Sequence, residues 1–350
     1  MTRLVIALLF FALPFATMNM KGQQTTPTDG APKSGEKPAV KSTDKSPDKA
    51  TSGSAPRSNN QKYKVELNYP AGAAYKYLFT DSTTVRRVYS DSSDLVYNRV
   101  VQYYISMKAP KDRANGVEDV LAVIDSTVYS FTSGDKTLNY YSGNEKMRLE
   151  FPDLLAHIHA EGREFKITWT PYWEVQSVEG EALDYWRDYV TRNGDGVDTM
   201  IKYIFLNAIS QNNLANYSDM QKGAFPNNLV RQDSAWKKPY FVRLDGVDCR
   251  DDSATSTLSY VSKNTYTVTT ELPSLRPSLN SMRLYNINQF CQILGGSGKG
   301  SQVITMTRRG EIVNTECVYD FNIRAKARNE EFTQNIKSKY KWKMLGKKEY

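Results

Sequence analysis

Long stretches in which apolar and polar residues alternate constrain the fold of this chain more than any other feature. The alternation runs through residues 64–81, 83–108 and 118–131, and it returns at 240–248, 255–272 and 302–327. Because successive side chains of a strand point to opposite faces, the pattern predicts strands with one buried and one solvated face. Polar clusters at 91–94 and 309–310 predict hairpin turns. Half-solvated sheets are typically antiparallel, and the 23 tyrosines suit such strands.

A segment with helical spacing separates the two strand-rich stretches. We expect a helix after Pro152 and others over 182–193 and 197–214, the last with Asp198 as its N-cap. Strands, then helices, then strands indicate an α+β fold: a predominantly antiparallel, curved β-sheet system with a helical insertion in the middle. The folded domain is predicted to cover 63–350. The same order of elements is compatible with two lobes within this domain, at 63–180 and 225–350, joined by helices in 181–222.

Three large aromatic residues lie beside turn residues. Such residues usually anchor the entry into a strand, so Trp236, Trp173 and Tyr77 are predicted to belong to the core of the sheet rather than to a ligand site.

The N-terminus has the layout of a secretion signal. Arg3 precedes an apolar run over 4–16 that is too short to span a bilayer comfortably, which predicts a signal peptide over 1–22. No cysteine follows the run until Cys249, so the protein is not expected to be a lipoprotein. We therefore expect a periplasmic or cell-surface protein with no transmembrane span after signal cleavage; an uncleaved anchor is the alternative.

Residues 23–62 are rich in Pro, Ser, Thr and Lys and contain almost no large apolar side chain, which predicts a disordered linker. The signal segment carries +2 and residues 24–62 carry +3 of the net charge of +8, which leaves +3 for the folded part. This balance is too mild to indicate nucleic-acid binding.

The three cysteines permit one disulfide and one free thiol in an oxidising compartment, and the sequence does not choose the pairing among Cys249, Cys291 and Cys317. Cys317 is in phase with Tyr319 and Phe321 on one face of a predicted strand. We therefore expect it to be buried as a small apolar residue.

Four short motifs are similar to those of a family of exported Gram-negative envelope proteins, known as a domain of unknown function. They are NYPAGAAYKY at 68–77, WEVQSVEG at 173–180, FPNNLVRQDSAWKKPY at 225–240 and the Gly-rich segment at 295–300. The third departs from the family at Gln232, where a Gly usually precedes the Asp. The resemblance implies a β-rich fold and an envelope location, and it implies no catalytic residue.

The two histidines do not form a recognisable site. His157 and His159 are two positions apart in a predicted helix, so their side chains point in different directions and cannot share a metal. One is expected to be partly buried and the other solvated. We predict no metal site, no Ser-His-Asp triad and no cofactor.

Three other segments are interpreted as structural. The sequence NGDGVD at 193–198 predicts a turn into a capped helix rather than a calcium loop. GGSGKG at 295–300 predicts a flexible turn rather than a phosphate loop, because no Ser or Thr follows the lysine. Asp248, Asp251 and Asp252 are expected in a solvated acidic turn, although a glycosidase pair stays open.

The C-terminal segment alternates lysines with other residues. In a strand, Lys337, Lys339, Lys341 and Lys343 would lie on one face, and an aromatic-rich stripe with Tyr340 and Trp342 would lie on the other. One interpretation is an edge strand that its lysines protect from aggregation. The other is that the four lysines form the candidate contact surface for an anionic partner.

Together these features favour a non-enzymatic exported envelope protein: a binding or structural module that uses a sheet surface or groove. The expected partner is an envelope protein, glycan or lipid, and no nucleic acid. The alternative is a carboxylate-based hydrolase acting on envelope polysaccharide, which would need two carboxylates converging in a pocket.

Overall fold

The computed structural model describes residues 61–111, 118–143, 152–172, 174–287 and 289–349. The predicted signal peptide over 1–22, the predicted linker up to residue 60 and Trp173 lie outside these residues. Within the described ranges, no helix is long and apolar enough to cross a membrane.

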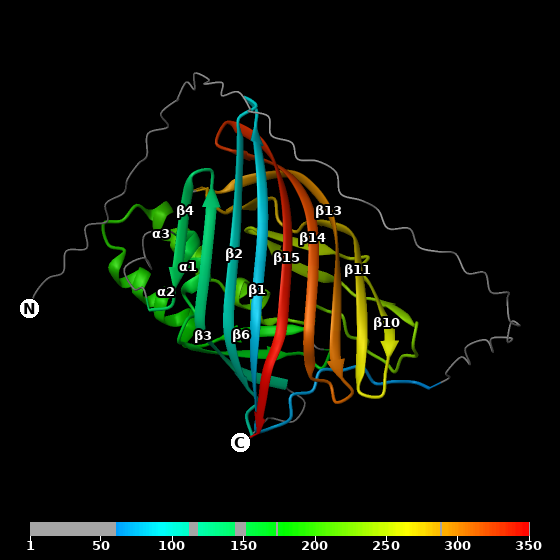
Figure 1. Cartoon of the computed structure of the whole chain (residues 1–350). Coiled ribbons are helices and arrows are strands. Elements are labelled where there is room, and N and C mark those ends of the chain that lie inside the picture. The colour runs from blue at the N-terminus through cyan, green and yellow to red at the C-terminus, as the bar shows by residue number, and fades with distance from the viewer. Residues whose placement is uncertain (1–60, 112–117, 144–151, 173, 288, 350) are drawn as a thin grey trace, which may run out of the picture. The chain divides into compact units, whose positions relative to one another are not determined.

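The described elements are four helices and fifteen strands; Figure 1 labels those for which there is room. The helices are α1 (Pro152–Ile158), α2 (Glu181–Asn193), α3 (Thr199–Ala208) and α4 (Gln211–Ser218). The strands are β1 (Ala73–Tyr89), β2 (Asp94–Lys108), β3 (Glu118–Ser133), β4 (Lys136–Tyr141), β5 (Glu164–Trp169), β6 (Val175–Glu179), β7 (Ala235–Lys237), β8 (Tyr240–Leu244), β9 (Val247–Asp251), β10 (Thr255–Val261), β11 (Thr265–Pro277), β12 (Ser281–Met282), β13 (Cys291–Thr307), β14 (Ile312–Ala327) and β15 (Glu330–Glu349). The predicted predominance of strands is confirmed.

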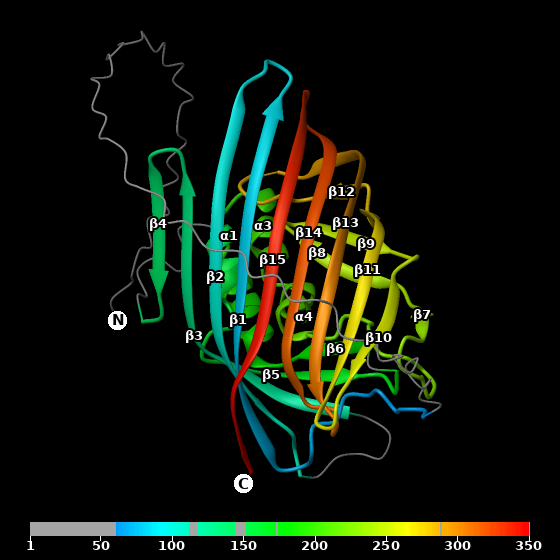
Figure 2. The ribbon, with the colours of Figure 1, turned by 45° about the vertical axis from the view of Figure 1, so that its right-hand side comes forward.

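The strands form one open sheet whose main path has the order β6-β5-β3-β2-β1-β15-β14-β13-β11-β10-β7. Four strands lie off this path: β4 pairs with β3, β12 pairs with β13, and β9 pairs with both β8 and β11. Every strand pair is antiparallel, as predicted. At its centre, β1 pairs with β15 from Ala73↔Glu349 to Tyr89↔Phe332. Strands from both strand-rich stretches therefore share one hydrogen-bonded sheet (Figure 2).

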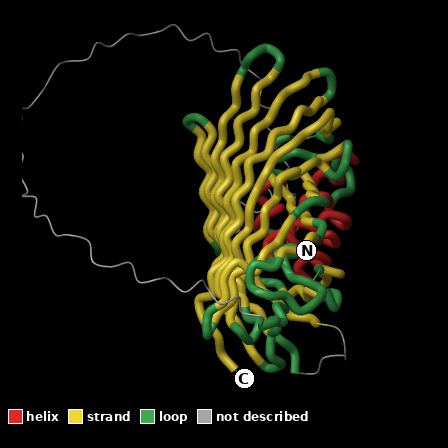
Figure 3. The backbone as a smooth tube through the Cα atoms, turned by 90° about the vertical axis from the view of Figure 1, so that its right-hand side faces the viewer, coloured by secondary structure: helices red, strands yellow, loops and turns green. Residues whose placement is uncertain are grey.

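All four helices lie against one face of the sheet, which curves around them (Figure 3), and all fall within 152–222 as predicted. Asp198 caps α3, because its carboxylate accepts from the main-chain N–H groups of Met200 (2.8 Å) and Ile201 (3.3 Å). The single helix predicted over 197–214 is wrong. The chain leaves the helix at Ile209, and Ser210 starts α4 by accepting from the N–H of Asn213.

An aromatic cluster fills the space between the helices and the centre of the sheet. Phe79 of β1 lies 4.7 Å from Trp342 and 5.6 Å from both Tyr103 and Tyr217, measured between ring centroids. Trp342 is 1% exposed and donates from Nε1 to Tyr217 O at 2.6 Å, which ties β15 to α4. The covered face of the sheet therefore carries the core.

The aromatic predictions are partly correct. Tyr77 is buried in the core and donates to Ile312 O at 2.9 Å. Trp236 packs against the core but is only half-buried, since β7 is a short edge strand that pairs with β10 alone. Its Nε1 donates to Ala224 O at 3.1 Å.

The Gly-rich segment at 295–300 is strand rather than the predicted flexible turn. It lies inside β13, where Gly296, Gly298 and Gly300 face β14. A Cβ on Gly298 would lie 2.6 Å from the Phe321 ring, and one on Gly300 would lie 2.8 Å from the Tyr319 ring. The glycines are needed because these rings lie across the β13 main chain.

The three cysteines are buried, and no disulfide joins them. Cys317 lies beside Tyr240, whose hydroxyl is 3.8 Å from its Sγ, and its predicted burial is confirmed. Burial raises the pKa of the Cys317 thiol to about 11. It is therefore a protonated packing residue at neutral pH.

Candidate functional site

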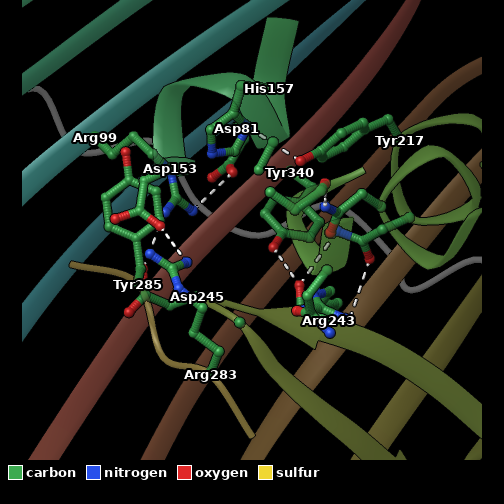
Figure 4. A pocket seen from close by; sticks show the side chains of 16 residues that line it. Asp81, Arg99, Asp153, His157, Tyr217, Arg243, Asp245, Arg283, Tyr285 and Tyr340 are labelled. Atoms are coloured by element: carbon green, nitrogen blue, oxygen red, sulfur yellow. Dashed lines mark hydrogen bonds and ion pairs between the residues drawn. The ribbon is translucent and has the colours of Figure 1, made fainter. Parts of the chain in front are cut away.

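Two hollows lie on the helix-covered side of the sheet. One is a polar cavity of about 50 Å³, shown in Figure 4, and the other is a groove of about 550 Å³. Asn216 of α4 and Arg243 of β8 line both. The cavity has room for a few water molecules, whereas the groove has the size of a ligand site.

Arg99 is the centre of the polar cavity. It comes from β2, its side chain is 3% exposed, and it donates from Nη1 to Asp245 at 2.9 Å and from Nη2 to Asp81 at 3.1 Å. Burial opposes the charge of Arg99, but Asp81 and Asp245 hold its pKa well above the ordinary value. The cluster is thus a buried ion pair shared by two carboxylates.

The other oxygen of each carboxylate also accepts a hydrogen bond. Tyr97 and Gln334 donate to Asp245 at 2.5 and 3.0 Å, and Thr83 donates to Asp81 at 2.6 Å. Burial raises the pKa of Asp245, while Arg99 and the Tyr97 hydroxyl partly counteract this. Two converging carboxylates are present, but both are fully engaged by the protein's own groups.

Both histidines are buried, so the prediction that one is solvated is wrong. His157 lies in the core side of α1, with Nδ1 3.2 Å from the Tyr103 hydroxyl and 3.0 Å from the Tyr217 hydroxyl. Burial, and then the positive charge of Arg99, lower the pKa of His157 well below its ordinary value. His159 lies just beyond α1, and its Nδ1 is 3.1 Å from Leu155 O. Burial lowers the pKa of His159 to about 4.

The predicted acidic turn is also wrong in part. Asp251 ends β9 and is fully buried, and its carboxylate accepts from the N–H groups of Ser253 and Ser274. Asp248 binds Arg243 at 3.2 Å, and the exposed Asp252 pairs with two arginines, Arg250 and Arg276. Each carboxylate has its own partners, so the three do not form a site.

Three elements form the walls of the groove. Residues 174–178 of the β6 region, one face of α4 with the turn after it, and the β8–β9 hairpin line it, together with Ser278 and Leu279. The packing of α4 against both β6 and β8 places these walls. Its polar lining residues include several amides and hydroxyls: Gln176, Ser177, Gln211, Asn212, Asn216 and Ser278.

Lys222 lies at the inner side of the groove. It is 4% exposed, has a φ of 38° that non-glycine residues rarely adopt, and donates from Nζ to Asn216 O (3.2 Å) and Oδ1 (3.1 Å). Burial lowers the pKa of Lys222, and the nearby Asp219 partly offsets this. Burial raises the pKa of Asp219, and Lys222 lowers it in turn. The groove thus has a balanced pair of charges at its base.

Two apolar side chains project at the rim. Phe241 is 56% exposed and Leu279 is 52% exposed, although both are large hydrophobic residues. The guanidinium of Arg250 lies 5.3 Å from the centroid of the Phe241 ring. An apolar rim above a polar base suits an amphipathic ligand.

The C-terminal strand is as predicted, but it is not an edge strand. Lys337, Lys339, Lys341 and Lys343 are exposed on the face of β15 opposite the helices, while Tyr340 and Trp342 are buried. β15 pairs with β1 on one side and β14 on the other, which removes the edge-protection interpretation. Glu316 of β14 binds Lys339 at 2.6 Å and Lys341 at 3.1 Å.

No family model matches the chain, and no curated protein matches its sequence at a significant level. Membership in the envelope family named above therefore stays a prediction. Among the described residues, no group of three or more His, Cys, Asp or Glu side chains could hold a metal ion.

Several solved structures resemble this chain at low identity. One, described by its lipid–protein interactions, is lipovitellin: 8% identical, with a TM-score of 0.40 over 81% of this chain. This chain spans about a quarter (26%) of the lipovitellin chain. A Bacteroides fragilis protein with a YmcC-like fold, thought to be exported, is 8% identical (TM-score 0.19; 83% of this chain and 100% of that chain). Pseudomonas aeruginosa OpdQ is 6% identical (TM-score 0.18; 78% and 99%). Scores below 0.5 carry no conclusion about function.

A sheet surface or groove was predicted as the binding site, but the residues of the groove were not. Lys222, Phe241 and Leu279 lie in separate segments with no motif, and only the fold brings them together. Lys222 and Gly223 after α4 both adopt positive φ (38° and 75°), and the only sequence signal of this turn is the glycine.

Proposed function

We propose that this protein is an exported, non-enzymatic binding module of the cell envelope, and that the groove is its ligand site. One observation carries the proposal: a groove of about 550 Å³ with the exposed Phe241 and Leu279 at its rim and polar side chains below. Ligand sites usually enclose about 300–1,000 Å³ and combine apolar walls with a few polar groups.

The partners of the groove carboxylates support binding rather than acid–base chemistry. Asp248 is bound to Arg243 at 3.2 Å, Glu174 lies 4.0 Å from Lys238 Nζ, and Asp219 accepts from the Lys222 N–H at 3.0 Å. In the cavity, Arg99 holds both Asp81 and Asp245. A general acid and base have to be available to a substrate, and of these groups Asp81, Asp245 and Asp248 are held in salt bridges.

The envelope location rests on the sequence. The apolar run over 4–16 after Arg3 supports export, and the long Lys- and Pro-rich segment over 23–62 supports a tether that gives the domain reach.

Saturation-transfer NMR with the low-molecular-weight fraction of an envelope extract tests the groove. We expect signals from bound compounds with the wild type, and their loss in Phe241→Ala. Tyr260→Ala is the matched control, because Tyr260 is equally exposed (55%) and lies outside the groove. Equal signals in both variants would place binding elsewhere, and no signal with the wild type would count against a ligand of this size.

The carboxylate hydrolase is the second candidate, because the raised pKa of Asp219, caused by burial, resembles that of a general acid and Glu174 lines the same groove. It predicts release of reducing ends from envelope polysaccharide and loss of this release in Asp219→Asn. The binding proposal predicts no release by either protein.

We also propose that the four lysines of β15 form a contact surface for an anionic envelope partner. Lys337 and Lys343 have no ion pair within the described ranges, so their charges are available, whereas Glu316 partly neutralises Lys339 and Lys341. Such a contact weakens with added salt, because screening acts within about 8 Å at physiological ionic strength.

Sedimentation with anionic phosphatidylglycerol vesicles tests the lysine surface. Changing all four lysines to Gln should weaken association at low salt and leave stability within about 0.5 kcal/mol. Changing four exposed lysines outside β15 to Gln is the control for net charge: Lys62, Lys136, Lys237 and Lys263. Association that is indifferent to all these changes and to salt would refute the surface.

A further inference from the structure

Consecutive residues at β6 line the groove, whereas a strand that contributed only its side chains would line it with alternate residues. Side chains alternate between the two faces of a strand, so a groove on one face touches every second residue. Here five consecutive residues, 174–178, line the groove. The groove therefore runs along the edge of β6, where the main chain itself is presented.

That edge has no partner strand. β6 is the first strand in the sheet order and pairs only with β5, from Lys166↔Glu179 to Trp169↔Val175. Apart from that ladder, no hydrogen bond joins the main chain of residues 175–178 to another described residue; the neighbouring Glu174 is bound through its O to Thr170 N at 2.8 Å. In an antiparallel strand, every second residue points its N–H and C=O away from the paired neighbour. The outer groups of β6 consequently face the groove unpaired.

Natural sheets usually protect such an edge with lysine, proline or a covering segment. The sequence of β6, VQSVE, has neither lysine nor proline. The open side is flanked by α4 and the β8–β9 hairpin, with the groove between them. This arrangement leaves the edge reachable by a single extended chain, while the flanking walls hinder the approach of a second sheet.

We propose that the ligand of the groove is an extended peptide that adds a strand antiparallel to β6, an inference that rests on the function proposed above. Strand addition supplies affinity through main-chain hydrogen bonds and selectivity through every second side chain. With a rise of about 3.4 Å per residue, the five residues of β6 offer a ladder about 17 Å long. A peptide of five or six residues matches this length.

The walls indicate which peptide side chains are accepted. Residues of the peptide that point outward meet Phe241 and Leu279, so apolar side chains are favoured there. Residues between them meet the polar lining of the groove, which includes the exposed amides of Gln211 and Asn212. An alternating apolar and polar peptide, the pattern of an unpaired strand from another exported protein, fits this surface.

A peptide library identifies a probe, and N-methylation tests the pairing. A phage-displayed library of linear nine-residue peptides is selected on the full chain, and the best binder is synthesised with each amide N-methylated in turn. We expect affinity to fall at least about tenfold at alternate positions, where an N–H is lost to β6, and to change little at the positions between them. The tolerated positions of the same peptide are the matched control.

Hydrogen exchange of the protein with and without the peptide gives an independent measurement. The peptide should protect amides within 175–178 with a period of two. Binding should be lost in Phe241→Ala and kept in Tyr260→Ala. Uniform effects of N-methylation, or no protection of β6, would overturn strand addition.

The probes also separate this inference from the proposed function. If no peptide is selected but a β-1,4-linked N-acetylglucosamine hexamer binds and Phe241→Ala removes its binding, the groove is a ligand site and the peptide inference is wrong. If neither the peptide nor the hexamer binds, both the peptide inference and the proposed ligand site are wrong.

Discussion

Asn216 of α4 is paired with the main chain of Arg243 on β8 through both ends of its side-chain amide. Its Nδ2 donates to Arg243 O and its Oδ1 accepts from Arg243 N, each at 3.2 Å. The same Oδ1 accepts from Lys222 Nζ at 3.1 Å. One side chain therefore joins the helix wall, the hairpin wall and the base of the groove.

Replacing Asn216 with Ala should cost about 1–3 kcal/mol of unfolding free energy and weaken ligand binding. The reason is that the change removes both side-chain hydrogen bonds to the Arg243 main chain and one of the two acceptors of Lys222 Nζ. Asn212→Ala, at an exposed lining position of the same helix, should change stability by less than about 0.5 kcal/mol. Urea unfolding measures both, and equal costs would show that Asn216 does not join the walls.

Arg99→Met should destabilise the protein by about 3–5 kcal/mol, because Asp81 and Asp245 would remain buried without their cation. Arg86→Met is the matched control: Arg86 makes an ion pair of 2.8 Å with Asp94, but its side chain is 64% exposed, so about 1 kcal/mol or less is expected. A loss below about 1 kcal/mol for Arg99→Met would contradict the role of the buried network.

Stability should fall on acidification because of the two buried histidines. Their pKa values are lowered in the folded state, so below about pH 6.5 the unfolded chain binds protons that the folded protein does not. Each histidine should cost about 2 kcal/mol between pH 7 and pH 5, and for His159 the loss ends near its folded pKa of about 4. Denaturant unfolding of the wild type, His157→Gln and His159→Gln across this pH range measures how much each histidine contributes to the pH dependence of the unfolding free energy. If His159→Gln keeps the full pH dependence, His159 is solvated in the folded protein.

The glycines of β13 provide a test of strand packing. Gly298→Ala should destabilise the protein by about 1–3 kcal/mol, because the added Cβ would lie 2.5 Å from Asp320 O and 2.6 Å from the Phe321 ring. Gly346→Ala in β15 meets nothing within 4 Å and should be neutral or slightly stabilising. Thermal unfolding of the two variants compares them directly. A flexible segment at 295–300 would instead tolerate Gly298→Ala.

Much of the architecture could be predicted because it follows from local patterns. The period-2 alternation at 337–343 predicts both the strand and the face on which its lysines lie, and Asp198 marks the start of α3. These signals are local, since a strand's two faces and a helix cap depend on residues a few positions apart.

Features that depend on contacts between distant parts of the chain could not be predicted from the sequence. Nothing local shows that β15 closes against β1, so the lysine strand could not be distinguished from an edge strand. Gly298 signals a turn by composition, and only the Phe321 ring across the ladder makes it a strand residue. The groove joins β6, α4 and β8, which are far apart along the chain, and its residues have no shared motif.

Photocrosslinking in intact cells tests most directly whether the groove is occupied by a ligand. A benzophenone amino acid replaces Leu279 at the rim or, as a control, the similarly exposed Leu229 (56%) outside the groove. The account predicts a defined adduct at Leu279, reduced when Asn216→Ala is added, and none at Leu229. No adduct at Leu279, or the same adducts at both positions, would contradict it.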